Sequence, residues 1–415
     1  MNRLQKLQFI DIYLLISLIS TGLFFMCCIL TNGRIFNEVL NYFTDMQFND
    51  YFIMEAFSSG LNHVYEIDRI DVCQPPLIYC LLFLVYKVVP VFVPDNKQWN
   101  VLTESNHQMT LFLMLNLIMV LVLVYALGQI FNKNSFKYNV LLPIAILFSY
   151  PMFGTSLQRG NVITFTMIFL LLAYAWIDSD NKLKSELSLI MISLATANKI
   201  TPATCGWSLI KRRDWARVAR LVIYGLLIFV IPFIFTGGLQ GLRTYIENLT
   251  ARSDIPVTYG SVKGMTTLIL QIFGKRIPII SDQFAMIMGS IVQWIFLSLM
   301  LVGAWITKEK WREVLCIMGI LAGFVSVNFS YVLIFLLPAF MMFLKKQEDQ
   351  PKNNIADYIS LICFSLIFTI PFYFMFSSWG VEGGCFLVMY FMLAVVVVDE
   401  IRMWICDHRR RVAND

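Results

Sequence analysis

Two carboxylates stand five residues apart in a polar segment near the start of the chain: Asp45 and Asp50. A Pro-Pro pair at positions 75 and 76 follows, which suits the first turn of a helix because backbone N–H groups there lack an internal partner. A carboxylate fixed beside such a helix could act as a general base toward a sugar or lipid hydroxyl. The segment also has a simpler interpretation, since lysines are retained on the cytoplasmic side of a membrane and leave outer segments acidic.

Two cations lie within or at the end of apolar runs. Arg159 precedes Gly160 and Asn161 in a short polar turn, and Lys199 stands in an otherwise apolar stretch at 186–210. A charged side chain at membrane depth is costly and marks a functional site or a buried partner. The alternative is that the long side chain reaches back to the membrane surface. Arg159 indicates function if its turn is buried.

Basic residues gather in a second long polar segment, 237–282. They are Arg243, Arg252, Lys263, Lys275 and Arg276. Arg and Lys can neutralise the developing charge of a leaving phosphate without a metal ion. Anchoring to lipid phosphates is the alternative. Further along, Asn328 to Tyr331 interrupts an apolar stretch and puts polar side chains near the same compartment, although such a segment is also an ordinary turn.

The elements that must position these groups are membrane-spanning helices. Of the 415 residues, 58% are hydrophobic and 14% are charged, against roughly 45–50% and about 25% in soluble domains. Lipid cannot hydrogen-bond a backbone, so apolar runs of about twenty residues must be helices. We therefore predict an all-α, polytopic bundle that forms a single integral membrane domain over 1–415.

About twelve spans are expected. The first run, 9–30, is too long for the apolar part of a signal peptide and is taken as a retained helix. Two short spans meet at the polar turn 154–161, whose tip lies either at the cytoplasmic surface or buried at depth. The expected spans are 9–30, 75–94, 108–131, 138–156, 161–177, 186–210, a segment that ends near 235, 284–306, 313–327, 329–344, 355–376 and 385–398.

Lys and Arg orient this arrangement, because they flank short loops on the cytoplasmic side. Both termini are then cytoplasmic in a plasma (inner) membrane, and segments 31–74 and 237–282 are extracytoplasmic. Four lysines fall on the outer face against the rule: Lys133, Lys137, Lys182 and Lys184. The first outer segment is acidic, and its aromatic run at 48–57 predicts an amphipathic helix in the membrane interface.

Metal and redox chemistry have little support in the sequence. The nine cysteines lie mostly inside apolar runs, where a thiol behaves as a small hydrophobe. The three histidines are far apart, so we expect no metal site and no cofactor. Membrane lipids are expected partners, and nucleic acid is not.

In order along the chain, these segments resemble the GT-C superfamily of polytopic glycosyltransferases, most of all glycosyltransferase family 87. The first outer segment is similar in Asp50-Tyr51-Phe52, Glu55-Ala56, Gly60, Tyr65 and Gln74-Pro75-Pro76-Leu77. Later elements are similar in Gln158-Arg159-Gly160-Asn161, in Lys199-Ile200-Thr201-Pro202 with Arg212-Arg213-Asp214-Trp215-Ala216-Arg217, and in the stretch from Tyr331 to Pro338. Two departures are Asn328-Phe329-Ser330, where some members place a histidine, and Gln74 in place of the commoner aromatic residue.

The resemblance implies an inverting, metal-independent transfer of a mannose-like hexose. The donor would be a polyprenyl-phosphate sugar, and the acceptor a lipid-linked or cell-envelope glycan on the outer face. Asp50 is then the general base, with Asp45 as its competitor, and Lys263, Arg243 or Arg252 holds the donor phosphate. The other residues expected to bind substrate are Tyr65, Arg159, Asn161, Lys199, Asn328 and Tyr331.

Two other functions stay open. A transporter or flippase for lipid-linked oligosaccharides would also be polytopic, but such proteins usually carry internal repeats and broken helices at the membrane midplane. No repeated half is visible in the sequence. A polymerase that joins preassembled glycan units would share the basic outer segment and the same compartment.

Overall fold

The computed structural model describes residues 8–39, 48–67, 72–88, 106–133, 135–253, 260–274, 281–324, 329–349, 353–370 and 378–412. Every regular element in these ranges is a helix, which confirms the all-α prediction. Six helical segments are long and apolar enough to cross a membrane, or seven if one bent pair is a single span, and four shorter apolar helices accompany them. The polytopic architecture is confirmed, whereas the count of twelve spans is not.

The chain divides into two compact units. One comprises Met1–Tyr42, Ser135–Gly154 and Pro256–Asp415, and the other comprises Phe43–Asn134 and Thr155–Ile255. We call them the terminal unit and the central unit, after their positions in the sequence. All predicted catalytic residues belong to the central unit.

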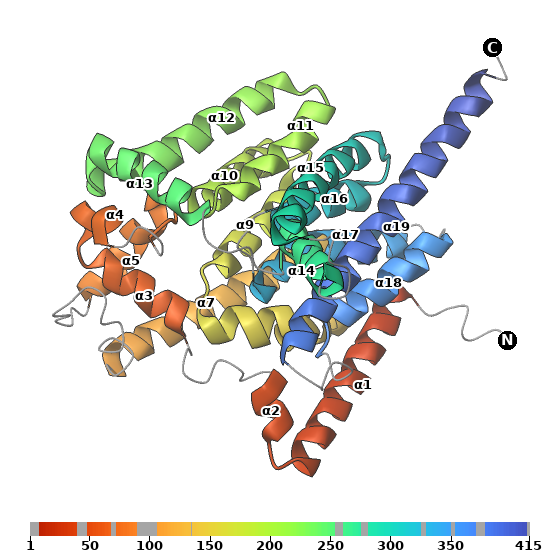
Figure 1. Ribbon diagram of the computed structural model, residues 1–415, viewed down its shortest axis with the longest axis horizontal. Helices are drawn as coiled ribbons and strands as arrows, with labels where there is room; N and C mark the ends of the chain where they lie inside the picture. Colours follow the sequence, from red (N-terminus) through yellow and green to blue (C-terminus); the bar gives the residue numbers. More distant parts are fainter. Residues whose placement is uncertain are drawn as a thin grey trace. The chain divides into compact units, whose positions relative to one another are not determined.

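The central unit is built around α9 (Ile163–Trp176). This helix is apolar on all sides and 11 of its 14 side chains are buried, as expected for a helix surrounded by other helices. It packs against α7 and α10, and α10 also packs against α12 (Figure 1). The other helices of this unit are α3 (Asn49–Ser58), α4 (Val64–Ile67), α5 (Pro76–Val88), α7 (Asn106–Phe131), α10 (Lys182–Asn198), α11 (Trp207–Lys211), α12 (Trp215–Val230) and α13 (Gly238–Ser253).

The two ends of α9 carry different polar groups. Just beyond its C-terminal end, Asp178 accepts hydrogen bonds from Arg212 in the basic turn. Nearby, Gln129 of α7 accepts from both Trp176 (3.3 Å) and Lys184 (3.2 Å). The C-terminal ends of α7 and α9 and the start of α10 therefore lie on one side of this unit, together with the basic turn.

These contacts bring Lys184 to the same end of the central unit as the Arg212 turn, whereas the expected spans put the two at opposite ends. Lys133, Lys182 and Lys184 lie at the Arg212 end of the central unit, and in the terminal unit Lys137 donates to Asp11 at the start of α1 (3.1 Å). The described part of the expected span 75–94 is α5, which has 13 residues.

The terminal unit has α16 (Lys310–Gly323) at its centre, with every side chain after Lys310 buried. α15 (Asp282–Ile306), α17 (Leu337–Asp349) and α19 (Ser378–Val412) pack around it (Figure 1). α1 (Phe9–Leu30) has the predicted bounds and lies against α17 and α18 (Ile355–Ile367). The predicted span 138–156 is broken, with a bend of 54° between Lys137–Leu147 and Tyr150–Leu157.

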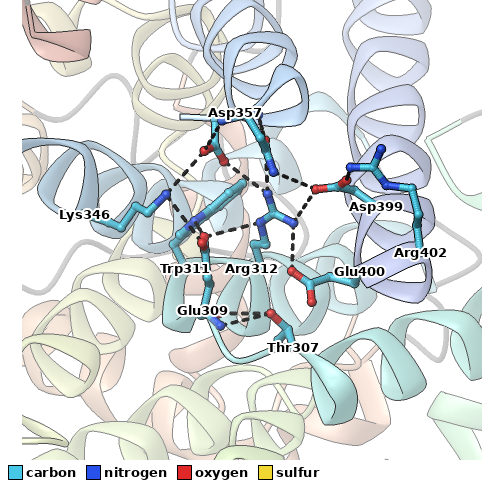
Figure 2. A network of polar contacts seen from close by, with 10 residues as sticks. Thr307, Glu309, Trp311, Arg312, Lys346, Asp357, Asp399, Glu400 and Arg402 are labelled. Carbon is cyan, nitrogen blue, oxygen red and sulfur yellow. Dashed lines mark hydrogen bonds and ion pairs between the residues drawn. The ribbon is translucent and has the colours of Figure 1, made fainter. Parts of the chain in front are cut away.

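A group of charged side chains around the buried Arg312 joins four helices of the terminal unit (Figure 2). Arg312, which is fully buried, donates to Asp399 (2.9 Å), Glu400 (2.8 Å) and Asp357 (3.2 Å). Lys346 also contacts Asp357, at 3.3 Å. We call the whole group the charged cluster; its members are Glu309, Arg312, Lys346, Asp357, Asp399, Glu400 and Arg402.

Both predicted outer segments contain helices. The first holds α2 (Arg34–Val39), α3 and α4, and the second holds α13 and α14 (Val262–Gly274). The helix expected over 48–57 is present as α3, and its apolar side chains are buried against α5 and against Phe112 of α7. α3 is thus part of the core of the central unit.

Candidate functional site

The start of α3 is fixed against the polar turn at 158–161. Phe48, which precedes the helix, has a left-handed backbone conformation (φ 58°), and its N–H donates to the carbonyl of Gln158 at 2.8 Å. The turn therefore lies beside α3, at the opposite end of α9 from Arg212. Asp50, in the first turn of α3, is brought next to this turn.

Asp50 accepts three hydrogen bonds from two side chains of the turn. Arg159 donates through Nη2 to Oδ1 (2.9 Å) and through Nε to Oδ2 (3.1 Å), and Asn161 donates through Nδ2 to Oδ2 (2.6 Å). The two-pronged arginine contact fixes the plane of the carboxylate. Asn161 is itself oriented, because its Oδ1 accepts the N–H of Ile163 (2.9 Å) at the start of α9.

Gly160 allows this close approach. Its φ is +66°, which favours glycine, and a Cβ at this position would lie 2.9 Å from the Cβ of Tyr51 and 3.2 Å from the ring of Phe112. A side chain here would push α3 away from the turn. The sequence Arg-Gly-Asn is therefore required by the geometry: the flanking residues hold the carboxylate, and the glycine lets the two backbones meet.

The arrangement leaves the carboxylate able to accept one more proton donor. An ionised carboxylate offers about four acceptor positions, and three are used here. The Asp50 side chain is 18% exposed and Arg159 is 13% exposed, so the pair lies at the edge of the protein interior. A narrow pocket is lined by residues next to the pair, among them Tyr51, Gly160 and Asn161. The exposed edge of Asp50 leaves its carboxylate accessible to a hydroxyl.

Lys199 lies at the same end of the central unit. It ends α10, and the preceding Asn198 donates through Nδ2 to the carbonyl of Val162 (3.1 Å) and to the hydroxyl of Thr166 (2.7 Å). These bonds tie the end of α10 to the start of α9, directly after Asn161. Lys199 is thus placed near the turn that holds Asp50.

Tyr65 is buried among aromatic rings of α5, η7 (Ile231–Phe235) and α13. Its hydroxyl donates to the carbonyl of Gln74 at 3.1 Å, and burial raises its pKa. Asn248 of α13 donates to the carbonyls of Tyr65 (2.9 Å) and Val72 (3.0 Å). Within the described chain, the hydroxyl of Tyr65 is thus used to shape the first outer segment.

The predicted phosphate-binding residues are divided between the two units. Arg243 of α13 is 74% exposed and pairs with Glu247 at 3.1 Å. Arg252 belongs to the last turn of the same helix, and its side chain lies outside the described part. Lys263 stands in the first turn of α14, in the terminal unit.

The remaining predicted site residues are Tyr331, Asp45 and Asn328. Tyr331, half-buried in η8 (Ser330–Leu336), belongs to the terminal unit. Asp45 and Asn328 lie outside the described residues. Among the described residues, no group of three or more His, Cys, Asp and Glu side chains could hold a metal ion.

Glu55 was not among the predicted site residues. It lies on α3, five residues after Asp50, and is completely buried. In the described part of the chain, neither carboxylate oxygen has a hydrogen-bond partner, and burial raises the pKa of Glu55 to about 8. The only sequence signal was a single carboxylate within an otherwise apolar helical stretch.

Comparison with known proteins gives one match. A family model described as glycosyltransferase family 87 matches residues 76–333, which is more than half of the chain. The matched region contains Arg159, Asn161 and Lys199 and begins after Asp50. No curated protein and no solved structure matches the chain.

Proposed function

Because the chain belongs to glycosyltransferase family 87, we propose that it transfers a mannose-like hexose from a polyprenyl-phosphate donor to a lipid-linked or cell-envelope glycan. Membership of the family makes the protein a glycosyltransferase, and its apolar helices make it a multi-pass membrane protein. Both properties were expected from the amino-acid sequence. The donor, the acceptor and the outer face of the plasma membrane as the place of reaction belong to the proposal.

The contact of Asp50 with Arg159 and Asn161 carries the proposal. Asp50 accepts the proton of the acceptor hydroxyl while that oxygen attacks the anomeric carbon. The new C–O bond forms on the face opposite the leaving polyprenyl phosphate, whose C–O bond breaks, so the configuration at this carbon inverts. Such a base typically contributes 10²–10⁴-fold to the rate. Asp50 is preferred to Asp45 because its partners hold it in one orientation.

The two ends of α9 support a site on the outer face. Asp50 lies at one end and the Arg212 turn at the other. Basic turns between spans are retained in the cytoplasm, which makes the Asp50 end extracytoplasmic. With Lys133, Lys182 and Lys184 now on the side of the turn, the conflict that these lysines posed for the orientation disappears.

The cations of the second outer segment are proposed to receive the donor phosphate. Arg243 and Arg252 belong to α13, in the same unit as Asp50, and α13 packs against α4 of the first outer segment. Arg243 is exposed and shares its charge with a single carboxylate, Glu247. It is therefore available to an anionic ligand at that surface, and Lys263 is the alternative.

The direct test is Asp50→Asn in purified protein supplied with polyprenyl-phosphate hexoses. We expect release of polyprenyl phosphate to fall by 10²-fold or more, because the amide keeps the shape but cannot take a proton. Asp178→Asn is the matched control, since Asp178 pairs with Arg212 at the other end of α9. Native turnover by Asp50→Asn would remove Asp50 from the role of base.

Exchanging the charges of Asp50 and Arg159 distinguishes a catalytic role of Asp50 from a purely structural ion pair. The double variant Asp50→Arg with Arg159→Asp restores opposite charges, so a structural pair would be rescued. We expect the double variant to fold and to remain inactive. Recovery of activity would show that only the attraction between the two groups matters.

The orientation is tested with single introduced cysteines. The exposed Glu66 of α4 and the exposed Arg213 of the basic turn are replaced by cysteine in separate variants. The background carries Ser in place of the exposed Cys406. We expect an impermeant thiol reagent to label position 66 in intact cells and position 213 only after permeabilisation. The opposite pattern would place the site in the cytosol.

A further inference from the structure

Glu55 is a buried carboxyl group without a compensating partner. Its side chain is completely buried, and neither of its oxygens has a hydrogen bond within the described residues. Burial of an unpaired carboxylate is so costly that the group takes up a proton instead. In agreement, burial raises the pKa of Glu55 to about 8, so the carboxyl is neutral at pH 7.

The neighbours of Glu55 leave its charge without compensation. Tyr51 lies one turn earlier on α3, and its buried hydroxyl also has no hydrogen-bond partner in the described chain. α5 brings Tyr86, which is close enough for the charge of Glu55 to act on it, and the exposed Lys87. Of the other helices that pack on α3, α4 brings the exposed Glu66, and α7 begins with the exposed His107. Around Glu55 lies the apolar core of the central unit.

α3 connects this buried carboxyl to the candidate site. Tyr51, on the same face as Glu55, packs against Gly160 so closely that a Cβ there would lie 2.9 Å from the Cβ of Tyr51. Gly160 stands between Arg159 and Asn161, and these two hold Asp50 on the same α3 helix. A displacement of α3 therefore moves Asp50 itself and also, through Tyr51 and Gly160, changes the packing of the turn that carries Arg159 and Asn161.

We propose that Glu55 is a positioning residue of the Asp50 site: as a neutral carboxylic acid it lets α3 pack in the core, and its ionisation displaces α3 and separates Asp50 from Arg159 and Asn161. The proposal rests on the function proposed for Asp50. It makes transfer activity dependent on a proton held at a distance from the substrate. Ionisation draws water or a cation toward Glu55, which the packed core does not admit.

The first test is the pH profile of kcat/KM for the wild type and for Glu55→Gln, which keeps the shape and stays neutral. We expect wild-type activity to fall about tenfold for each pH unit above about 8, as a single ionisation requires. Glu55→Gln should stay level up to about pH 10. Glu66→Gln removes an exposed carboxyl nearby and should keep the wild-type profile.

The second test follows α3 without relying on activity. Hydrogen exchange at residues 49–58, corrected for the intrinsic effect of pH, should quicken above pH 8 in the wild type and not in Glu55→Gln. An unchanged alkaline loss of activity in Glu55→Gln, or exchange in α3 that does not depend on pH, overturns the proposal. If Glu55→Gln folds poorly, Glu55→Leu replaces it with the same expectations.

The proposed roles of Asp50 and Glu55 can be refuted independently of each other. If Asp50→Asn is fully active while exchange in α3 still follows the charge of Glu55, the role of Asp50 is wrong and Glu55 still controls the packing of α3. If Asp50→Asn is inactive and Glu55→Gln keeps the wild-type profile, Asp50 retains its role and the role of Glu55 is wrong.

Discussion

Replacement of Arg312 should be among the most destabilising single changes in the terminal unit. Arg312 is fully buried and donates to three carboxylates that are 2%, 9% and 5% exposed: Asp357, Asp399 and Glu400. In Arg312→Met, Asp357 keeps Lys346 and Asp399 keeps Arg402. Glu400 has no second cation among the described contacts.

The expected loss of stability follows from the number of carboxylates that are left without a cation. Removal of one partner of a buried pair typically costs 3–5 kcal/mol because the other charge stays buried. With one carboxylate left without a cation and two that keep one each, we expect a loss of about 4–5 kcal/mol. Arg312→Met with Glu400→Gln removes the uncompensated charge and should recover about half of that loss. Lys308→Met is the control, since Lys308 and Asp407 form an exposed pair worth about 0–1 kcal/mol.

Equilibrium unfolding of the purified protein in mixed detergent micelles measures these differences. Trp311, whose ring lies 5.2 Å from the Arg312 guanidinium, gives a local fluorescence signal. A loss below about 1 kcal/mol for Arg312→Met would refute the reasoning, because it would mean that the carboxylates are already protonated or hydrated. Equal losses for Arg312→Met and Lys308→Met would do the same.

Three further changes test the central unit. Gly160→Ala should lower transfer activity at least tenfold with little change in the affinity for the donor, because its Cβ would lie 2.9 Å from the Cβ of Tyr51; steady-state kinetics check this. Asn248→Ala should cost about 1–3 kcal/mol in the same unfolding assay, because it leaves two buried carbonyls of the first outer segment without their donor. The free energy of unfolding of the wild type should fall by up to about 5 kcal/mol as pH rises from about 4.5 to about 8. The cause is the pKa of Glu55, which at about 8 lies above its ordinary value, so the folded state keeps the proton over this range. Glu55→Gln should show no such fall when unfolding is measured over the same range.

Long apolar runs were well predicted from the sequence. The bounds of α1 agree with the expected span 9–30 because a single uninterrupted run of this length has few alternatives in lipid. The expected span 75–94 is described only as far as Val88, the end of α5. The order of the expected spans did not predict that Lys184 shares an end of the central unit with the Arg212 turn.

The candidate site was predicted in its parts and not in its connections. Asp50 and Arg159 were each singled out, but they are 109 residues apart, and no pattern in a single sequence pairs them. Arg159 was expected to contact substrate, which stays a prediction, and the structure adds that it donates to Asp50. Glu55 and Arg312 were missed for a related reason. Burial of a charged residue depends on which helices pack around it, and the local sequence does not predict that packing.

α9 also bears on the depth of the site. Its 14 residues rise about 21 Å, yet both of its ends are held by polar pairs, and a bilayer core is about 30 Å thick. If α9 crosses the membrane, as expected for the span 161–177, the difference of about 9 Å is met by a thinned bilayer or by a water-filled depression. A substrate anchored in the leaflet reaches such a recessed carboxylate by sliding sideways, whereas a free sugar in solution would have to descend to it.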